Sequence, residues 1–563
     1  MHGVASGDPG ADRVIIWTRL TTVFGAMAAE EEEVTWELAE DEAFSRVAAR
    51  GETTSGRGRD GTVKVDVTGL QPSRDYFYRF KAYGADSPVG RTRTLPVGRT
   101  RELRLAVVSC TLIPAGWFNA YAEIAREPRL DAVLHLGDYL YEYGGPNSYG
   151  VSERTPPERM PQPQHECVSL VDYRTRHAQY KEDPDLQAAH AAHPWIVTWD
   201  DHEVANDTWV HGAENHQPAT EGLFDRRKAA ALQAYYEWMP IREPAPGRAR
   251  EAVERSFDFG DLATLVIVET RLQARSQQVT YGDKDLPRAV YDASDPARRV
   301  RVTDPAVTRR VMAEVEAGRP APAPYRVSPE PAGVLERLSE PSRQLLGARQ
   351  EGWIAGELHR SVAAGRPWQV IGNQVVMGRA KVQDVVKGLG GAAAFDAMLT
   401  RLSEAGRARL RRLADLGPIG LPYNLDSWDG YPAARERLLR ILKASGGNPV
   451  VLAGDSHSFW VNELRDAGGA RVAAEFGTSS VTSPSAGDSA PQADLGAMLA
   501  EQNPEILFCD QASKGYVRLT FTRDLCRGEL ISTGVSRPYT PRTIGTWTVR
   551  PSAGPGVGAI TRA

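Results

Sequence analysis

The stretch Leu134-His-Leu-Gly-Asp138-Tyr-Leu-Tyr141-Glu142 decides the fold. It continues the run 131–134, whose apolar residues predict a buried strand, and its glycine permits a sharp turn out of that strand. Asp138 and Tyr141 therefore stand just beyond a strand end. In open α/β sheets, ligands bind beyond the carboxyl ends of the strands. The stretch thus predicts a polar site at one edge of a sheet.

Three other segments show the same order, an apolar strand followed by polar side chains. They are residues 103–110, 195–203 and 449–457. The first ends in Cys110, the second in Asp201 and His202, and the third in Asp455 and His457. Because each strand end carries a side chain able to bind a metal, we expect the four ends to form one site.

Length and composition restrict the class of protein. The chain has 563 residues, which predicts two or more domains, and its net charge of −5 gives no sign of a nucleic-acid surface. No apolar run is long enough to span a membrane. Four cysteines are too few for a disulfide scaffold, so a Cys509–Cys526 bridge and plain buried thiols both stay open. No basic and apolar leader opens the sequence, which indicates either a cytosolic protein or a removed leader.

The chain changes character near residue 100. Residues 1–98 contain alternating, β-branched and aromatic strand candidates separated by turns, which predicts a β-sandwich of immunoglobulin or fibronectin type. Residues 103–545 alternate strands and helices, which predicts an α/β catalytic domain. Within it, 276–345 is rich in Pro, Arg and Ala and is expected to be a surface insertion. Residues 546–563 are expected to form a frayed C-terminal tail.

The candidate ligands form a mixed set of carboxylates, imidazole, thiolate, phenolate and amide. Carboxylates outnumber soft ligands, which favours cations of high coordination number, and a thiolate with a phenolate favours a ferric-type ion. Each residue alone has an ordinary explanation, as a helix cap, a turn residue or a buried thiol. Their recurrence after four strands favours the metal site. We expect Asp138 to bridge two metals, which together hold the attacking and leaving oxygens of a phosphoryl transfer.

Three motifs also carry a family resemblance: Gly137-Asp138-Tyr-Leu-Tyr141, Thr198-Trp-Asp-Asp201-His202-Glu203-Val-Ala-Asn206 and Ala453-Gly454-Asp455-Ser-His457-Ser. They resemble the motifs of the PhoD-type alkaline phosphatases, within the calcineurin-like metallophosphatase superfamily. The opening His2-Gly-Val-Ala-Ser-Gly-Asp8-Pro9 resembles that family's N-terminal β domain. The chain departs from the wider superfamily's Asp-x-His, Gly-Asn-His and Gly-His-x-His motifs as the PhoD group does.

The resemblance implies a fold, two metals and a location. The fold would be two packed mixed β-sheets flanked by helices. An Fe³⁺ site would use Cys110, Asp138, Tyr141 and His457, and a Ca²⁺ site would use Asp138, Asn206 and Asp455. Asp201 occupies the place of a superfamily ligand, so Asp201 and Asn206 stay alternatives, and Zn²⁺ or other divalent metals are alternative ions. The resemblance also implies export to the periplasm or the exterior, with the leader absent from this sequence.

The expected function is hydrolysis of phosphate mono- and diesters, as an alkaline phosphatase with phosphodiesterase activity. Water activated by the metals would attack phosphorus without a phosphorylated enzyme. His202 would contact the phosphate or protonate the leaving alkoxide, or else orient a ligand carboxylate, and Arg271 is a candidate for contact with a phosphate oxygen. The alternatives are a phospholipase D-like phosphodiesterase, a hydrolase that uses zinc alone, and a non-catalytic binding protein on the same scaffold.

Overall fold

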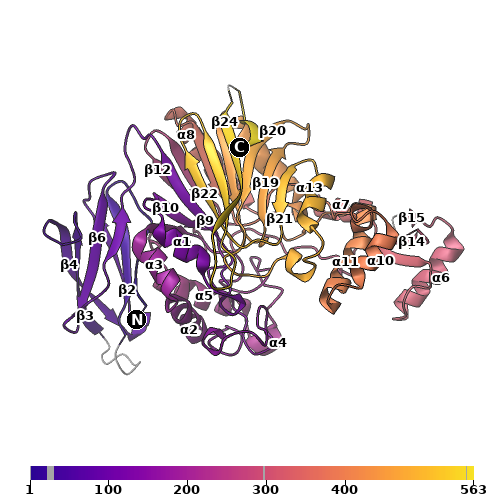
Figure 1. Ribbon diagram of the computed structural model, residues 1–563, viewed down its shortest axis with the longest axis horizontal. Coiled ribbons are helices and arrows are strands. Elements are labelled where there is room, and N and C mark those ends of the chain that lie inside the picture. Colours follow the sequence, from indigo (N-terminus) through magenta and orange to yellow (C-terminus); the bar gives the residue numbers. More distant parts are fainter. Residues whose placement is uncertain (1, 22–30, 296–297, 553) are drawn as a thin grey trace.

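The computed structural model describes residues 2–21, 31–295, 298–552 and 554–563. The remaining positions, which fall in the predicted N-terminal domain, insertion and tail, lie outside the described residues. Two large sheets pack against each other in the middle of the molecule, with helices on their outer faces (Figure 1). The prediction of an α/β fold with two packed mixed sheets is confirmed.

The first sheet has ten strands, which come from both ends of the chain. Its order is β25 (Val557–Arg562), β24 (Arg542–Pro551), β23 (Cys526–Ser532), β22 (Gly515–Phe521), β9 (Leu103–Val108), β10 (Ala132–His135), β11 (Pro194–Val197), β1 (Val4–Gly7), β2 (Arg13–Arg19) and β5 (Thr62–Thr68). The four adjacent strands β9, β10, β11 and β1 run parallel to one another. The end of β9 thus lies beside the ends of β10 and β11.

The second sheet has seven strands and packs face to face with the first. Its order is β12 (Arg255–Phe259), β13 (Ala263–Ile267), β17 (Trp368–Gly372), β18 (Asn448–Ala453), β20 (Arg471–Gly477), β19 (Phe459–Arg465) and β21 (Ile506–Asp510). The core between the sheets takes buried side chains from both, including Leu105, Leu134, Leu265 and Val450. Burying each such side chain contributes about 1.5–3 kcal/mol.

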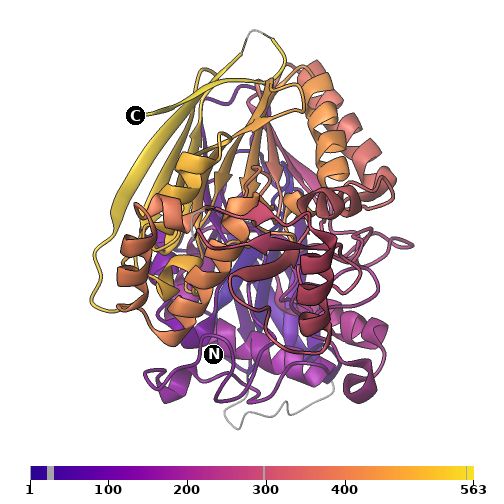
Figure 2. The same ribbon diagram turned by 90° about the vertical axis from the view of Figure 1, so that its right-hand side faces the viewer.

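Helices cover the outer face of each sheet (Figure 2). On the ten-stranded sheet these are α1 (Asn119–Arg126), α2 (Leu170–Lys181), α3 (Pro184–Ala192) and α5 (Phe224–Trp238). On the seven-stranded sheet these are α8 (Gly347–Ala363) and α12 (Pro432–Ala444). Ile354 and Leu358, four residues apart on α8, show the helical spacing that buries one face. No helix of the described ranges is long and apolar enough to cross a membrane.

The N-terminal segment forms a sandwich, but one of its sheets continues into the ten-stranded sheet. The separate sheet contains β4 (Val47–Gly56), β3 (Glu31–Ala39), β6 (Asp75–Ala82), β7 (Ala85–Asp86) and β8 (Gly90–Arg93). It packs against β2 and β5 through buried residues such as Val14, Ile16 and Val34. Ser6 of β1 pairs in parallel with Pro194 of β11. The N-terminal unit is therefore hydrogen-bonded to a catalytic strand.

The insertion and the C-terminus differ in how they pack. The insertion 276–345 contributes a three-stranded sheet and two helices, which extend at the right of Figure 1: β14 (Arg288–Asp292), β15 (Val300–Arg301), β16 (Tyr325–Pro329), α6 (Pro305–Glu316) and α7 (Pro331–Leu338). The tail 546–563 does not fray where it is described, because β25 pairs with β24. Gly554, Pro555 and Gly556 lie between these strands, whereas Pro551 and Gly558 are part of them.

The remaining helices and turns complete the described chain. The helices are α4 (Pro218–Glu221), α9 (Val385–Gly388), α10 (Ala392–Leu399), α11 (Glu404–Leu416) and α13 (Leu495–Gln502). The 3-10 turns are η1 (Arg57–Arg59), η2 (Ile113–Ala115), η3 (Pro157–Arg159), η4 (Gly417–Ile419), η5 (Trp428–Gly430) and η6 (Ala486–Ser489). All four cysteines are buried free thiols, and Cys509 and Cys526 lie on strands of different sheets.

Candidate metal centre

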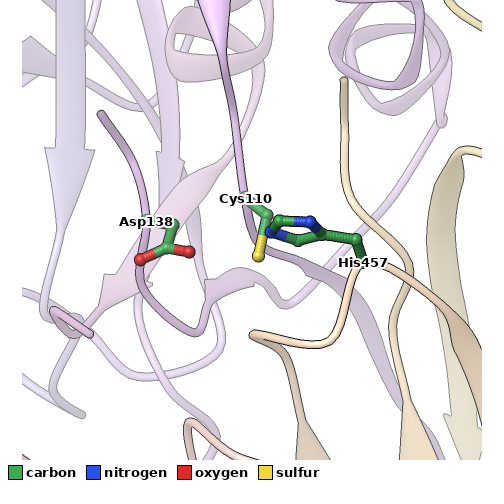
Figure 3. Close-up of side chains that lie close together, drawn as sticks. All are labelled: Cys110, Asp138 and His457. Atoms are coloured by element: carbon green, nitrogen blue, oxygen red, sulfur yellow. The ribbon is translucent and has the colours of Figure 1, made fainter. Parts of the chain in front are cut away.

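The predicted strand ends meet at one edge of the paired sheets. Cys110 follows β9, Asp138 follows β10, Asp201 follows β11 and His457 follows β18. A bridge between residues 109 and 480 joins the ends of β9 and β20, so the two sheets converge there. One potential ligand atom from each of Cys110, Asp138 and His457 lies within 4.8 Å of the others, and Figure 3 shows these side chains facing one another.

The backbone at these strand ends adopts a conformation that residues with a side chain rarely take. Cys110, Asp138, Asp455 and His457 have φ of 61°, 54°, 60° and 56°. Left-handed φ in a non-glycine residue costs about 1–3 kcal/mol and clusters at functional sites. Gly137, at φ 108°, comes so near the turn after β11 that a Cβ there would lie 2.4 Å from the backbone nitrogen of Asp200. The turns that position these side chains are therefore strained.

A buried carboxylate holds two of these turns together. Glu203 accepts hydrogen bonds from the backbone N–H of Asp138 (3.1 Å), Tyr139 (2.6 Å) and Asp200 (2.8 Å). These donors belong to the turns after β10 and β11. Glu203 thus fixes the separation of Asp138 from the carboxylates that follow β11.

The hydrogen bonds of His457 determine which ring nitrogen can bind a metal. Its Nδ1 donates to the carbonyl oxygen of Pro484 at 2.7 Å, which leaves the lone pair on Nε2. Burial lowers the pKa of His457 to about 4, so the ring is neutral. Nε2 lies 3.0 Å from the Tyr141 hydroxyl, which also donates to Asp138 Oδ2 at 3.1 Å. The predicted ligands Tyr141, Asp138 and His457 are thus in mutual contact.

The carboxylates form two further groups next to the first. Asp138, Asp201 and His202 make one, and Asp200, Asp201 and Asp455 make the other, with ligand atoms again within 4.8 Å of one another. Asp138 and Asp201 each belong to two of these three groups.

Asn206 lies nearby, and its environment differs from that of Asp201. The Asn206 side-chain amide donates to Glu214 at 3.1 Å. Its backbone N–H donates to Glu142 at 2.8 Å. The carboxylate of Asp201 has a ligand atom within 4.8 Å of those of Asp200 and Asp455. Asp201 and Asn206 both stay predicted ligands of the second metal.

Arg271 is completely buried, and its guanidinium contacts carboxylates on every side. It donates to both oxygens of Asp200, at 2.5 and 3.0 Å, and Nη1 donates to both oxygens of Asp426, at 3.0 and 2.8 Å. Nη2 also lies 3.3 Å from Asp455. These contacts use the donors that a phosphate would need, so Arg271 in this structure holds the acidic residues in position.

The sequence reasoning did not assign a role to Glu142, Asp200 or Asp426. Glu142 is completely buried and accepts from His202 Nδ1 at 2.7 Å. It stands in the opening motif, one residue after Tyr141, and this position is the feature of the sequence that could have marked it as a site residue. Asp200 stands inside the second motif, whereas Asp426 lies on a separate loop that no strand pattern marks.

Comparisons with known proteins agree with this geometry. A family model described as PhoD-like phosphatase matches residues 105–530, and one for the N-terminal domain of that family matches residues 1–96. The chain belongs to the PhoD-like phosphatase family.

Two relatives of this PhoD-like phosphatase cover most of its length. Alkaline phosphatase D of Bacillus subtilis (strain 168) is 35% identical over 531 residues, which are 92% of this chain and 75% of that protein. A solved structure titled "Structure of PhoD" superposes with a TM-score of 0.74 and 30% identity, and the match covers 100% of this chain and 91% of that one. The chain is therefore a phosphatase, and the resemblance read from its motifs is confirmed.

The charges at the centre of this PhoD-like phosphatase fit a bound cation. Burial and the neighbouring Asp138 carboxylate raise the pKa of both the Cys110 thiol and the Tyr141 phenol. Burial also raises the pKa of Asp138, against the effect of His202. Among the described residues, Asp138 Oδ1 and Asp201 Oδ1 are buried without a hydrogen-bond partner. Multivalent cations would satisfy these oxygens and favour the ionised ligands.

Proposed function

We propose that the protein hydrolyses phosphate mono- and diesters at a centre of two cations. The observation that carries this proposal is the position of Asp138. Its carboxylate belongs both to the group with Cys110 and His457 and to the group with Asp201 and His202. A carboxylate shared in this way can bridge two metals.

The donor sets of the two groups differ, and so do the ions they favour. We assign an Fe³⁺-type ion to Cys110, Asp138, Tyr141 and His457, because thiolate and phenolate ligands favour it. We assign a Ca²⁺-type ion to the oxygens of Asp138, Asp201 and Asp455, because Ca²⁺ takes oxygen ligands. Asn206 is the alternative to Asp201. The cations, when bound, neutralise the phosphate and lower the pKa of water.

The side chain of His202 contacts substrate in this proposal. Glu142 holds Nδ1, which leaves Nε2 to hydrogen-bond a phosphate oxygen and to deliver a proton to the leaving alkoxide. Arg271 acts differently from a phosphate-binding arginine, because it keeps Asp200, Asp426 and Asp455 in place. We therefore propose a positioning role for Arg271.

Diesters are included because the centre opens into a wide cavity. The cavity has a volume of about 590 Å³, and its lining includes Tyr149, Asp207, Asp426 and His457. A space of this size accommodates an ester substituent in addition to the phosphate. A location outside the cytoplasm rests on the family resemblance alone.

The proposal is tested by elemental analysis of the purified protein together with hydrolysis of 4-nitrophenyl phosphate and bis(4-nitrophenyl) phosphate. We expect iron and calcium with activity on both esters. The His202→Ala variant should keep its metals and lose about 10²–10⁴-fold in turnover. Stoichiometric zinc alone, with activity, would contradict the assigned ions but not the proposed hydrolysis of phosphate esters. Absence of metal, with no activity after iron and calcium are added, would contradict the proposed function.

A further inference from the structure

We propose that the cavity beside the metal centre binds a second anionic group on the substrate, through Arg409 and Arg412 of α11. This inference rests on the proposed function and specifies its substrate class. The substrate would be a phosphoester whose leaving group joins a ring-containing body to a carboxylate or a further phosphate.

The cavity lies beside the metal centre and reaches α11. Its lining includes the assigned metal ligand His457 and, from α11, Arg409 and Arg412. A single space of about 590 Å³ thus contacts both His457 and the helix. Pockets of about 300–1,000 Å³ are typical for small organic ligands. An ester with its phosphate at the centre would place its leaving group in this cavity.

The two arginines differ from the others near the centre. Arg409 and Arg412 are three residues apart on a helix, which puts them on one face. In the described part of the chain, neither makes an ion pair with a carboxylate. The Arg409 side chain is hydrogen-bonded to Tyr423, and its Nε is buried without a hydrogen-bond partner. Arg271 and Arg275, in contrast, both contact Asp426. The cavity therefore contains positive charge that the protein does not neutralise by ion pairing.

Aromatic side chains form another part of the cavity lining. Tyr149, Tyr281 and Tyr423 line it, and their hydroxyl groups already have partners. Tyr149 donates to the carbonyl of residue 484 at 2.9 Å, Tyr281 donates to that of residue 422 at 2.5 Å, and Tyr423 accepts from Gln511 at 3.0 Å. Because these hydroxyl groups are bonded within the protein, the aromatic rings are what the three residues offer to a ligand, which favours a ring-containing body.

Charge and shape together define the ligand. Arginine binds carboxylate and phosphate with paired hydrogen bonds, so both anions fit the two guanidinium groups. The apolar lining also includes Leu413 and Leu416, from the same helix as the arginines. A ring between the phosphate and the second anion would contact this lining while its charge reaches Arg409 or Arg412.

The test compares two esters that differ in the distal group, 4-nitrophenyl phosphate and 4-carboxyphenyl phosphate. The variant Arg409→Gln/Arg412→Gln removes both charges, and Arg411→Gln removes an exposed charge from the same helix outside the cavity lining. We expect the double variant to lose about 10–100-fold in kcat/KM on the carboxylated ester relative to the nitro ester. The loss should lie in KM, because the contact is remote from the phosphorus. Arg411→Gln should change this ratio by less than about twofold.

A binding measurement separates recognition from turnover. Calorimetry with 4-carboxybenzylphosphonate, which is not hydrolysed, should show weaker binding to the double variant than to Arg411→Gln at equal thermal stability. An unchanged ester ratio and unchanged phosphonate binding would overturn this inference and leave the proposed function standing. An equal loss on both esters would also overturn it. Hydrolysis of neither ester by the wild type would overturn the proposed function and this inference with it.

Discussion

Replacing Glu142 by Gln should impair catalysis without removing any metal ligand. The carboxylate of Glu142 receives three hydrogen bonds in a fully buried position. Oε2 accepts from His202 Nδ1 at 2.7 Å, and Oε1 accepts from Asn206 N and Asn215 Nδ2, each at 2.8 Å. Although burial opposes ionisation, His202 and these donors lower the pKa of Glu142, so it is a carboxylate. A glutamine side chain has only one acceptor oxygen, so it cannot accept both from His202 and from the pair Asn206 and Asn215.

Either orientation of the glutamine leaves donors facing each other. With its oxygen toward His202, the new NH₂ meets two N–H donors, and each unsatisfied buried donor costs about 1–3 kcal/mol. With its oxygen toward Asn206 and Asn215, the NH₂ meets His202 Nδ1–H. Although burial opposes it, the Asp201 and Glu142 carboxylates raise the pKa of His202 in the wild type, so its ring carries protons on both nitrogens. The second arrangement costs less if the ring releases its Nδ1 proton, so we expect His202 to lose its positive charge in the variant.

The assay is kcat/KM for an aryl phosphate, together with metal content and thermal unfolding. We expect about 10–100-fold lower kcat/KM, the usual cost of removing a partner that orients an active-site group, with metals retained. The matched control is Glu214→Gln, because Glu214 is exposed and also accepts from the Asn206 loop. Its activity should stay within about twofold of the wild type. A Glu142→Gln enzyme as active as this control would refute the reasoning.

Two further predictions concern the metal and the turn. Cys110→Ser should remove the iron-type ion and its thiolate charge-transfer absorption while the calcium content stays; unchanged iron content and spectrum would contradict the assigned ligand. Gly137→Ala should destabilise the protein strongly, because its Cβ would lie 2.4 Å from a backbone nitrogen. Gly98→Ala is the control, because Gly98 also has a positive φ but lies in open space. It should lose only the free energy that a left-handed backbone costs a residue with a side chain, about 1–3 kcal/mol. Equal melting temperatures of these two alanine variants would contradict the close approach.

The strand ends of the site could be predicted because they depend on local pattern. An apolar run followed by Asp138 or Asp455 marks a strand and its carboxyl end, and parallel strands bring such ends together. The two packed sheets follow from the same alternation of strands and helices. Family resemblance then added the identity of the ligands, which spacing alone left open.

The contacts that hold the site together depend on positions far apart in the chain. Arg271 contacts Asp426 across 155 residues, and Glu142 contacts Asn215 across 73. No periodicity connects these residues, and a lone Asp on a loop has many ordinary uses. The sequence shows Arg271 after a strand but not the carboxylates around it, so its contact with phosphate could be predicted while its contacts with Asp200 and Asp426 could not.

The pairing of β1 with β11 and of β22 with β9 has a consequence for the nascent chain. Ser6 pairs with Pro194, and Leu103 of β9 pairs with Phe521 of β22. At about 5–20 residues per second, a ribosome needs on the order of 20–80 s to pass from β9 to β22. During that time β9 has an open edge, which can pair with other strands. β1 is made before β11, its partner, and the ten-stranded sheet is complete only after β25 emerges, so the order of synthesis and the order of assembly differ.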